Sequence, residues 1–273
     1  MMRPSVAGHD PPQPRLMADT IQPQAERPGA TDAPVLLFLH GAACGALVWQ
    51  QGFAQHCAGA GFGGESLDFL RLGPEGRAAG IGEYVAQARA AIRRIGRPVV
   101  LVGHSLGALV AQLLLLEPAV KGVALLAPVP PEGLWFSSTR LAWSDPSLWS
   151  EAARMDAPVG QADPALVASL FGPTMPLAEA QRFLALMGGE SRQALVEAQG
   201  PQAVPHGWLH NRPVLVLGGG EDRLIAPDAV QRCALWHNAG ATFLPGMGHL
   251  LMLEPGWPQV AERVVEWLGR FQR

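Results

Sequence analysis

Short apolar runs that alternate with helical stretches are the feature that most restricts the fold of this chain. Residues 35–39 and 99–102 are uninterrupted apolar runs, typical of strands buried on both faces of a sheet. Between them, residues 81–95 carry apolar side chains every three or four positions, which predicts an amphipathic helix. Three further short runs predict strands at 123–126, 214–217 and 242–244. Because helices also follow at 106–116 and 258–268, the order predicts an α/β fold with a mostly parallel sheet and helices on both faces.

One long segment does not follow this alternation. Residues 129–205 contain no convincing strand and several helix-like stretches interrupted by proline and glycine. We therefore expect a helical lid at 129–205, inserted into a core made of 34–128 and 206–273. Residues 1–33 are rich in proline and predict a flexible tail. A chain of 273 residues is long enough for such a core and its insertion, but not for two large domains.

Composition and charge exclude several classes of protein. The 20 Lys and Arg residues stand against 23 Asp and Glu, so the net charge of -3 provides no basic field for nucleic acid. No polybasic cluster, apolar run of signal-peptide length or membrane-spanning run of about 18 residues is present, so we expect a cytoplasmic protein without a membrane anchor. Three cysteines without C-x-x-C spacing predict neither disulfides nor a metal site.

The pattern Gly-His-Ser-Leu-Gly occupies residues 103–107, between a predicted buried strand and a predicted apolar helix. This is the context of a nucleophile elbow, in which a sharp strand-to-helix turn exposes a serine hydroxyl. The glycines allow the turn to pack and a substrate to approach. Ser105 is therefore the candidate nucleophile, with the amides at the start of the following helix directed at a developing oxyanion.

A serine hydroxyl needs a base to remove its proton and a carboxylate to orient that base. Asp222 follows the predicted strand at 214–217, and His249 follows the one at 242–244. Loops at the carboxyl ends of parallel strands meet at one edge of the sheet, so these side chains can converge there. Glu221 is a weaker candidate for the acid, because adjacent loop side chains diverge.

The order Ser, Asp, His along the chain is that of one class of serine hydrolase. With the His40-Gly41 turn, the 103–107 motif, residues 220–225 and residues 246–255, the sequence resembles the α/β-hydrolase superfamily, in particular esterase- and lipase-like serine hydrolases with a helical lid. The resemblance covers residues 33–128 and about 204 to the end. It implies that Ser105 is the nucleophile, His249 the general base and Asp222 the orienting acid.

The same resemblance assigns supporting roles. It implies an oxyanion hole made by the backbone N–H groups of Ala42 and Leu106, with Ala43 as the alternative second donor, and it implies no cofactor. His40 and His104 adjoin the motifs, and we expect them to stabilise loops by hydrogen bonds. Glu254, which precedes Pro255, is expected to open the last helix.

The expected lid is rich in large apolar side chains, and its acidic residues outnumber its arginines. Short, interrupted helices cannot easily bury several tryptophans among themselves, so we expect Trp135, Trp143 and Trp149 to contribute to a substrate pocket. Such a roof would favour apolar over anionic substrates.

These observations predict a serine hydrolase that cleaves a small or medium, mainly apolar carboxylic ester through an acyl-enzyme. A C–C bond hydrolase, a thioesterase or an acyltransferase could use the same three residues. A non-catalytic ligand receptor is the alternative from a different class, since fold does not imply function. The expected partner is a small-molecule apolar ester and not nucleic acid, and the sequence leaves open whether the protein is a monomer or a dimer.

Overall fold

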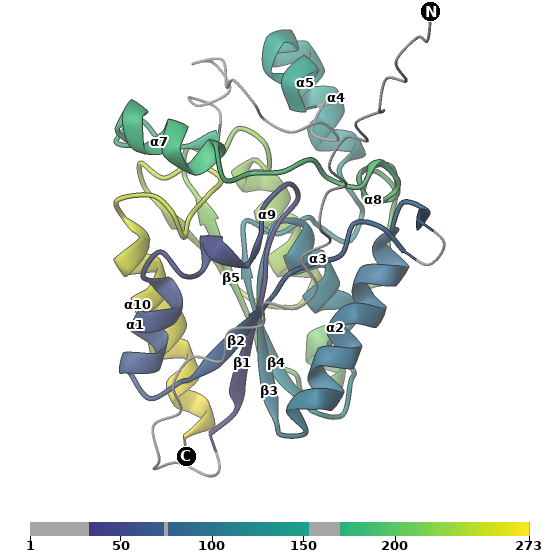
Figure 1. The fold of residues 1–273 in the computed structure, drawn as a ribbon, viewed down its shortest axis with the longest axis vertical. Helices are drawn as coiled ribbons and strands as arrows, with labels where there is room; N and C mark the ends of the chain where they lie inside the picture. Colours follow the sequence, from purple (N-terminus) through teal and green to yellow (C-terminus); the bar gives the residue numbers. More distant parts are fainter. Residues whose placement is uncertain (1–32, 74–75, 153–169, 273) are drawn as a thin grey trace, which may run out of the picture.

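The computed structural model describes residues 33–73, 76–152 and 170–272. A six-stranded, all-parallel sheet has the order β2-β1-β3-β4-β5-β6 (Figure 1). The strands are Val35–Leu39 (β1), Gly64–Leu67 (β2), Val99–His104 (β3), Val120–Leu126 (β4), Val214–Gly219 (β5) and Ala241–Leu244 (β6). The predicted α/β fold with a parallel sheet is confirmed. The sequence analysis missed only β2 among these strands.

Helices cover both faces of the sheet because the apolar strands point side chains alternately to either side. In β1, Leu36 and Phe38 face one core while Leu37 and Leu39 face the other. The first core is closed by α1 (Phe53–Gly59) and α10 (Trp257–Leu268). The second is closed by α2 (Ile81–Ile95), α3 (Leu106–Leu113) and α9 (Pro227–Trp236), on the opposite side in Figure 1.

Between β4 and β5 the chain forms a group of helices at one end of the molecule (Figure 1). They are α4 (Trp135–Ser144), α5 (Pro146–Ala152), α7 (Leu177–Leu184) and α8 (Arg192–Glu197). The described part of 129–205 contains helices and no strand, as the sequence predicted. Residues 153–169 of this segment lie outside the described residues, as does the predicted tail except for Ala33.

Backbone hydrogen bonds join the helical segment to the loops after β1 and β6. Leu170 O accepts hydrogen bonds from the backbone N–H groups of His249 and Leu250, at 2.9 and 3.2 Å, in the loop after β6. Gly188 N–H donates to Ala43 O at 2.8 Å, in the loop after β1. The segment therefore contacts the carboxyl-end loops on both sides of β3.

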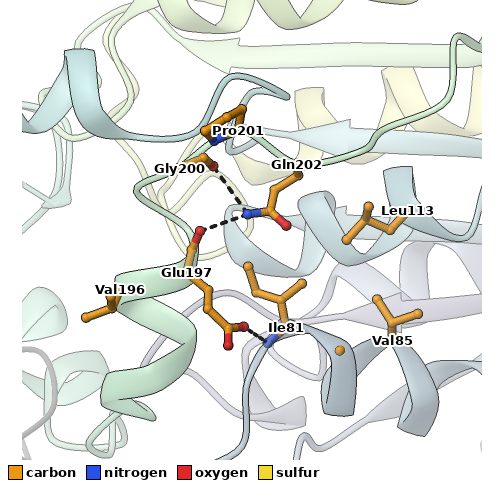
Figure 2. A pocket seen from close by; sticks show the side chains of 9 residues that line it. Ile81, Val85, Leu113, Val196, Glu197, Gly200, Pro201 and Gln202 are labelled. Atoms are coloured by element: carbon orange, nitrogen blue, oxygen red, sulfur yellow. Dashed lines mark hydrogen bonds between the residues drawn. The ribbon is translucent and has the colours of Figure 1, made fainter.

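A hollow of about 530 Å³ lies between α2 and α8 (Figure 2). Glu197 reaches across beside it, and its Oε2 accepts the Ile81 N–H at 2.7 Å. Its lining includes none of the residues that the sequence predicted for the site. No helix in the described ranges is both long and apolar enough to cross a bilayer.

Candidate active site

Ser105 occupies a strained turn between β3 and α3. Its φ of 52° and ψ of -116° lie outside the regions that L-residues ordinarily adopt. Such a conformation costs on the order of 1–3 kcal/mol and persists only where the surrounding structure enforces it. Here the Ser105 N–H donates to Leu126 O at 3.0 Å, and Ser105 O accepts from Ala108 N–H at 3.1 Å. These contacts build the nucleophile elbow that the sequence predicted.

The glycines on either side of Ser105 are required by close packing. A Cβ on Gly103 would lie 2.6 Å from the Ala108 Cα, and a Cβ on Gly107 would lie 2.3 Å from Leu39 O. Both distances are far below van der Waals contact, so α3 can pack against the sheet only where these side chains are absent. The two glycines thus fix the direction in which α3 leaves the elbow.

Asp222 and His249 come together as predicted. Their loops follow β5 and β6, and Asp222 Oδ2 lies 2.8 Å from His249 Nδ1. The other Asp222 oxygen, Oδ1, accepts the N–H groups of Leu224 and Ile225, both at 2.9 Å. Both side chains are buried, whereas Glu221 is exposed. The carboxylate is therefore held in one orientation and can fix the tautomer of the imidazole ring.

The loop that carries His249 is joined to the elbow by His104. His104 Nε2 lies 2.9 Å from His249 O, and the two ring centroids are 4.7 Å apart. Burial, followed by the proximity of His249, holds the pKa of His104 well below its usual value, so the ring stays neutral. No hydrogen bond joins the Ser105 hydroxyl to the His249 ring in the described residues. Such catalytic contacts are often long in a free enzyme and tighten when substrate binds.

The loop after β1 packs directly on this elbow. A Cβ on Gly41 would lie 3.0 Å from the Ser105 Cβ and 2.6 Å from His104 Nδ1, so the close approach requires glycine. His40 Nε2 accepts the Phe69 N–H at 3.1 Å, which leaves Nδ1 protonated to donate to Gly41 O at 2.8 Å. As expected from the sequence, both motif histidines stabilise loops.

The same loop distinguishes between the two predicted second donors of the oxyanion hole. The Ala43 N–H donates to Glu190 Oε2 at 3.0 Å. It is therefore already occupied, and Ala42 remains as the candidate partner of Leu106, the first residue of α3. Cys44 follows in this loop, and burial raises the pKa of its thiol to about 12, which keeps it protonated.

Glu254 has a role that sequence reasoning missed. Its side chain is fully buried and accepts the N–H groups of Gly248 at 2.6 Å and Gly172 at 3.0 Å. It therefore ties the residue before His249 to the helical segment, and α10 begins only at Trp257. Burial raises the pKa of this carboxyl to about 7.

This pKa predicts a pH-dependent contribution to stability. The folded protein holds the Glu254 proton more tightly than the unfolded chain does, so the contribution is full below about pH 4.5 and is lost as the pH rises through about 7. Glu254→Gln cannot ionise. We expect wild type to lose on the order of 2 kcal/mol relative to this variant between pH 5 and 8, measured by urea unfolding. Parallel pH profiles of the two proteins would contradict this assignment.

The three tryptophans predicted to line a pocket are exposed. Trp135, Trp143 and Trp149 have 65%, 86% and 44% of their surface accessible on α4 and α5. Among the described residues, no hydrogen bond or ring contact joins them to Ser105 or His249. Other apolar residues of the segment pack into the core beneath it instead: Leu141, Leu170, Phe171, Phe183, Leu184 and Met187.

The described residues show no evident ligand set for a metal ion. In the ranges that the structure describes, no three His, Cys, Asp or Glu side chains gather as they would around one metal ion. The carboxylates of Asp222 and Glu254 are instead bound to His249 and to backbone N–H groups.

A parallel sheet with a strained serine elbow after β3, and a paired acid and histidine after β5 and β6, defines the α/β-hydrolase fold. Residues 36–263 match the model of the alpha/beta hydrolase family. Because the match spans most of the sequence, the chain belongs to this family.

Solved structures resemble this fold at low sequence identity. A monoacylglycerol lipase from Paleococcus ferrophilus has a TM-score of 0.62 at 17% identity, over 88% of this chain and 96% of that one. A thermophilic esterase from Thermogutta terrifontis has a TM-score of 0.65 at 19% identity, over 93% and 98%. An esterase from a Rhodococcus species has a TM-score of 0.61 at 20% identity, over 88% and 92%. A search of curated proteins found no match.

Proposed function

We propose that the protein hydrolyses a small or medium, mainly apolar carboxylic ester through an acyl-enzyme. The observation that carries this proposal is the 2.8 Å contact between buried Asp222 and His249, beside a serine held in a nucleophile elbow. A strained serine, a histidine and an orienting carboxylate are the parts that acyl transfer requires. The esterases and the lipase with a similar fold agree with this assignment.

The proposed reaction begins at Ser105. Its Oγ attacks the ester carbonyl while His249 Nε2 takes the hydroxyl proton, because Nδ1 faces Asp222. The tetrahedral intermediate collapses and expels the alcohol, which takes the proton from the imidazolium. Water then attacks the acyl-enzyme by the same route, releases the acid and restores Ser105. Asp222 stabilises the imidazolium in both steps.

The negative charge that forms on the carbonyl oxygen needs donors in a fixed position. In this proposal the Leu106 N–H, at the start of α3, and the Ala42 N–H provide them. Planar trans peptides place N–H and C=O on opposite sides. Since Gly41 O accepts from His40 Nδ1 at 2.8 Å and from Cys44 N–H at 3.2 Å, the Ala42 N–H of the same peptide points away from both.

The preference for apolar acyl groups rests on the buried underside of the helical segment. Leu170 bonds the His249 loop through its carbonyl oxygen, and Met187 precedes the glycine that bonds the Ala43 loop. Both side chains are more than nine-tenths buried. Apolar side chains that adjoin both loops favour a substrate whose acyl chain displaces water.

Acyl-chain length provides a test of this surface. We expect kcat/KM for aryl esters to rise from acetyl to about hexanoyl, by about fourfold for each methylene at most, and then to fall. Met187→Ala should shift the optimum or flatten the rise. Trp143→Ala should leave the profile unchanged, because 86% of this side chain is exposed. An acetyl ester as the best substrate would exclude an apolar acyl pocket.

Covalent labelling separates an enzyme from a receptor on the same fold. A tagged fluorophosphonate should modify Ser105 in wild-type protein, with the site identified by peptide mass spectrometry. Thermal denaturation of the untreated protein provides the control for folding. A folded protein that neither reacts with the probe nor hydrolyses aryl esters would overturn the proposed function.

A further inference from the structure

The loop that carries Ala42 contains a strained residue. Ala43 has a φ of 59°, in the left-handed region that alanine avoids at a cost of roughly 1–2 kcal/mol. It is the third residue of a turn closed by the 3.2 Å bond from Cys44 N–H to Gly41 O, a position that normally favours glycine. The turn therefore does not hold this geometry by its local preferences alone.

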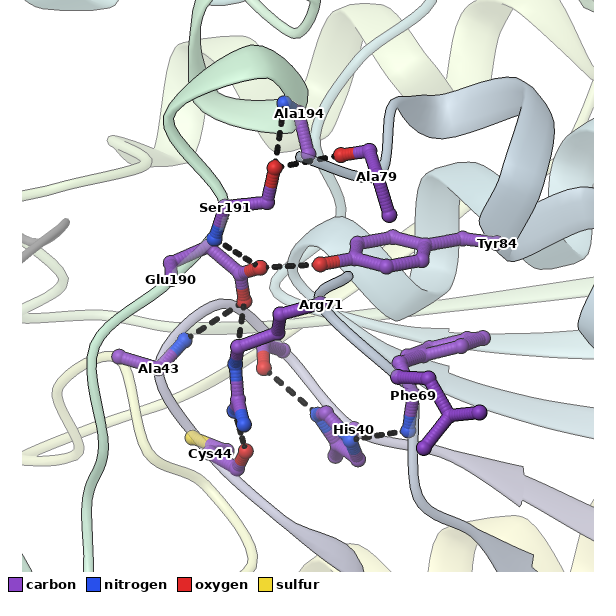
Figure 3. Close-up of polar contacts among 12 residues, drawn as sticks. His40, Ala43, Cys44, Phe69, Arg71, Ala79, Tyr84, Glu190, Ser191 and Ala194 are labelled. Atoms are coloured by element: carbon purple, nitrogen blue, oxygen red, sulfur yellow. Dashed lines mark hydrogen bonds and ion pairs between the residues drawn. The ribbon is translucent and has the colours of Figure 1, made fainter. Parts of the chain in front are cut away.

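The helical segment holds Ala43 by both of its backbone polar groups. The Ala43 N–H donates to Glu190 Oε2 at 3.0 Å (Figure 3). Ala43 O accepts the Gly188 N–H at 2.8 Å. The next carbonyl, Cys44 O, accepts a hydrogen bond from Arg71. Contacts from outside the turn thus constrain consecutive peptide groups next to Ala42.

Glu190 is itself held rigidly, although it is a buried carboxylate. Its Oε1 accepts the Tyr84 hydroxyl and the Ser191 N–H, the latter at 2.7 Å, and Arg71 Nε lies 3.7 Å from Oε2 (Figure 3). Tyr84 belongs to α2, so the carboxylate joins the helical segment, a core helix and the Ala43 turn. Donors therefore surround both oxygens of the carboxylate and hold it in one position.

We propose that Glu190 is a positioning residue for the oxyanion hole, which it shapes by holding the Ala43 turn so that the Ala42 N–H faces the reacting carbonyl. This proposal rests on the proposed function, since it assigns Glu190 to that same reaction. Glu190 does not touch the substrate. It acts through the Ala42–Ala43 peptide, whose plane is fixed by the Glu190 bond. In this proposal the helical segment contributes to transition-state stabilisation through Glu190.

The test compares two substitutions at Glu190. Glu190→Ala removes the acceptor of the Ala43 N–H, and we expect kcat to fall about 100-fold with KM within about threefold of wild type. The Glu190→Gln side chain has one oxygen for two backbone N–H groups, those of Ala43 and Ser191. We therefore expect its kcat to fall about tenfold. Tyr84→Phe removes one hydrogen bond to the carboxylate, and its kcat should fall a few-fold.

A matched control exists in the same segment. Like Glu190, Glu197 of α8 bonds α2, but through the Ile81 N–H at 2.7 Å, and among the described residues it has no hydrogen bond to the Ala43 turn. Glu197→Gln should keep wild-type kcat even if it lowers the melting temperature. A loss of kcat in Glu197→Gln equal to that in Glu190→Gln would show that only the general attachment of the segment matters, and would overturn the proposal.

The inhibition constant of a boronic acid tests the oxyanion hole directly. It should not change if Glu190 only stabilises the fold. The tetrahedral adduct of the boronic acid with Ser105 places an oxygen where the oxyanion forms, so the inhibition constant should rise in the Glu190 variants by about the factor that kcat/KM falls. Folded Glu190→Gln or Tyr84→Phe protein with the kcat and the inhibition constant of wild type would overturn the proposal. If both Glu190 variants fail to fold, Tyr84→Phe alone provides the test. Wild type without Ser105-dependent hydrolysis would instead refute the proposed function.

Discussion

Ser105→Ala is expected to reduce hydrolysis of a short aryl ester by roughly 10⁵-fold, to the level that binding and the oxyanion donors alone support. The reason is that Oγ is the atom proposed to form the acyl-enzyme, and no other hydroxyl occupies the turn between β3 and α3. Steady-state kinetics and loss of fluorophosphonate labelling would measure the effect.

The variant should remain folded. Alanine can adopt the backbone angles of Ser105 at a similar cost, and the Ser105 N–H and C=O bonds within the elbow do not involve its side chain. Circular dichroism and the melting temperature should match those of wild type. A Ser105→Ala protein that keeps more than about a hundredth of the wild-type rate would show that another group is the nucleophile.

His249→Ala is expected to be nearly as damaging, with a loss of roughly 10⁴- to 10⁵-fold in kcat, because no base then remains to take the Ser105 proton. Asp222→Asn should lose roughly 10³- to 10⁴-fold. An amide that faces His249 Nδ1 favours the wrong tautomer and no longer stabilises the imidazolium. The asparagine still fills the buried position of Asp222, which lies 2.8 Å from Nδ1 in wild type.

Glu221→Gln is the matched control for the acid. Its side chain is exposed, and its own N–H bonds Met247 O at 2.8 Å, so the loop should survive the change. We expect less than about a threefold change in kcat. A larger loss at Glu221 than at Asp222 would transfer the orienting role to Glu221.

The central strands and the flanking helices could be predicted because burial on both faces leaves a continuous apolar sequence. The expected bounds of β1 and α2 match those observed. The edge strand β2 was missed because it is not buried on both faces. Its residues, Gly64–Leu67, are only partly buried, pair with β1 alone and include Glu65, which forms an ion pair with Arg94. This half-exposed strand therefore has no apolar run that would mark it in the sequence.

Residues at the candidate site were predictable where a local pattern marks them. Ser105 lies in a motif that its glycines make sterically necessary, and Asp222 and His249 follow apolar strands. Glu190 could not be found in this way, because its partner Ala43 lies 147 positions away in the sequence. The same holds for Glu254 and Gly172, which are 82 positions apart.

The exposed tryptophans illustrate a different limit of sequence patterns. Apolar content in an inserted segment indicates that some surface must be buried, but it does not say which side chains are buried. Leu170 and Met187 pack into the core, whereas Trp143 is 86% exposed on α4.

The hydrogen bonds that join the helical segment to the loops of the candidate site have a consequence for exchanging this segment between relatives. The segment leaves the sheet after β4 and returns at β5, which are adjacent strands, so a replacement of different length would not alter the strand order. It would have to supply an acceptor for the His249 loop, as Leu170 O does, and a carboxylate with a neighbouring N–H for Ala43. If the proposed roles are right, a chimaera that lacks these connections would combine a new substrate-facing surface with a poorly formed oxyanion hole.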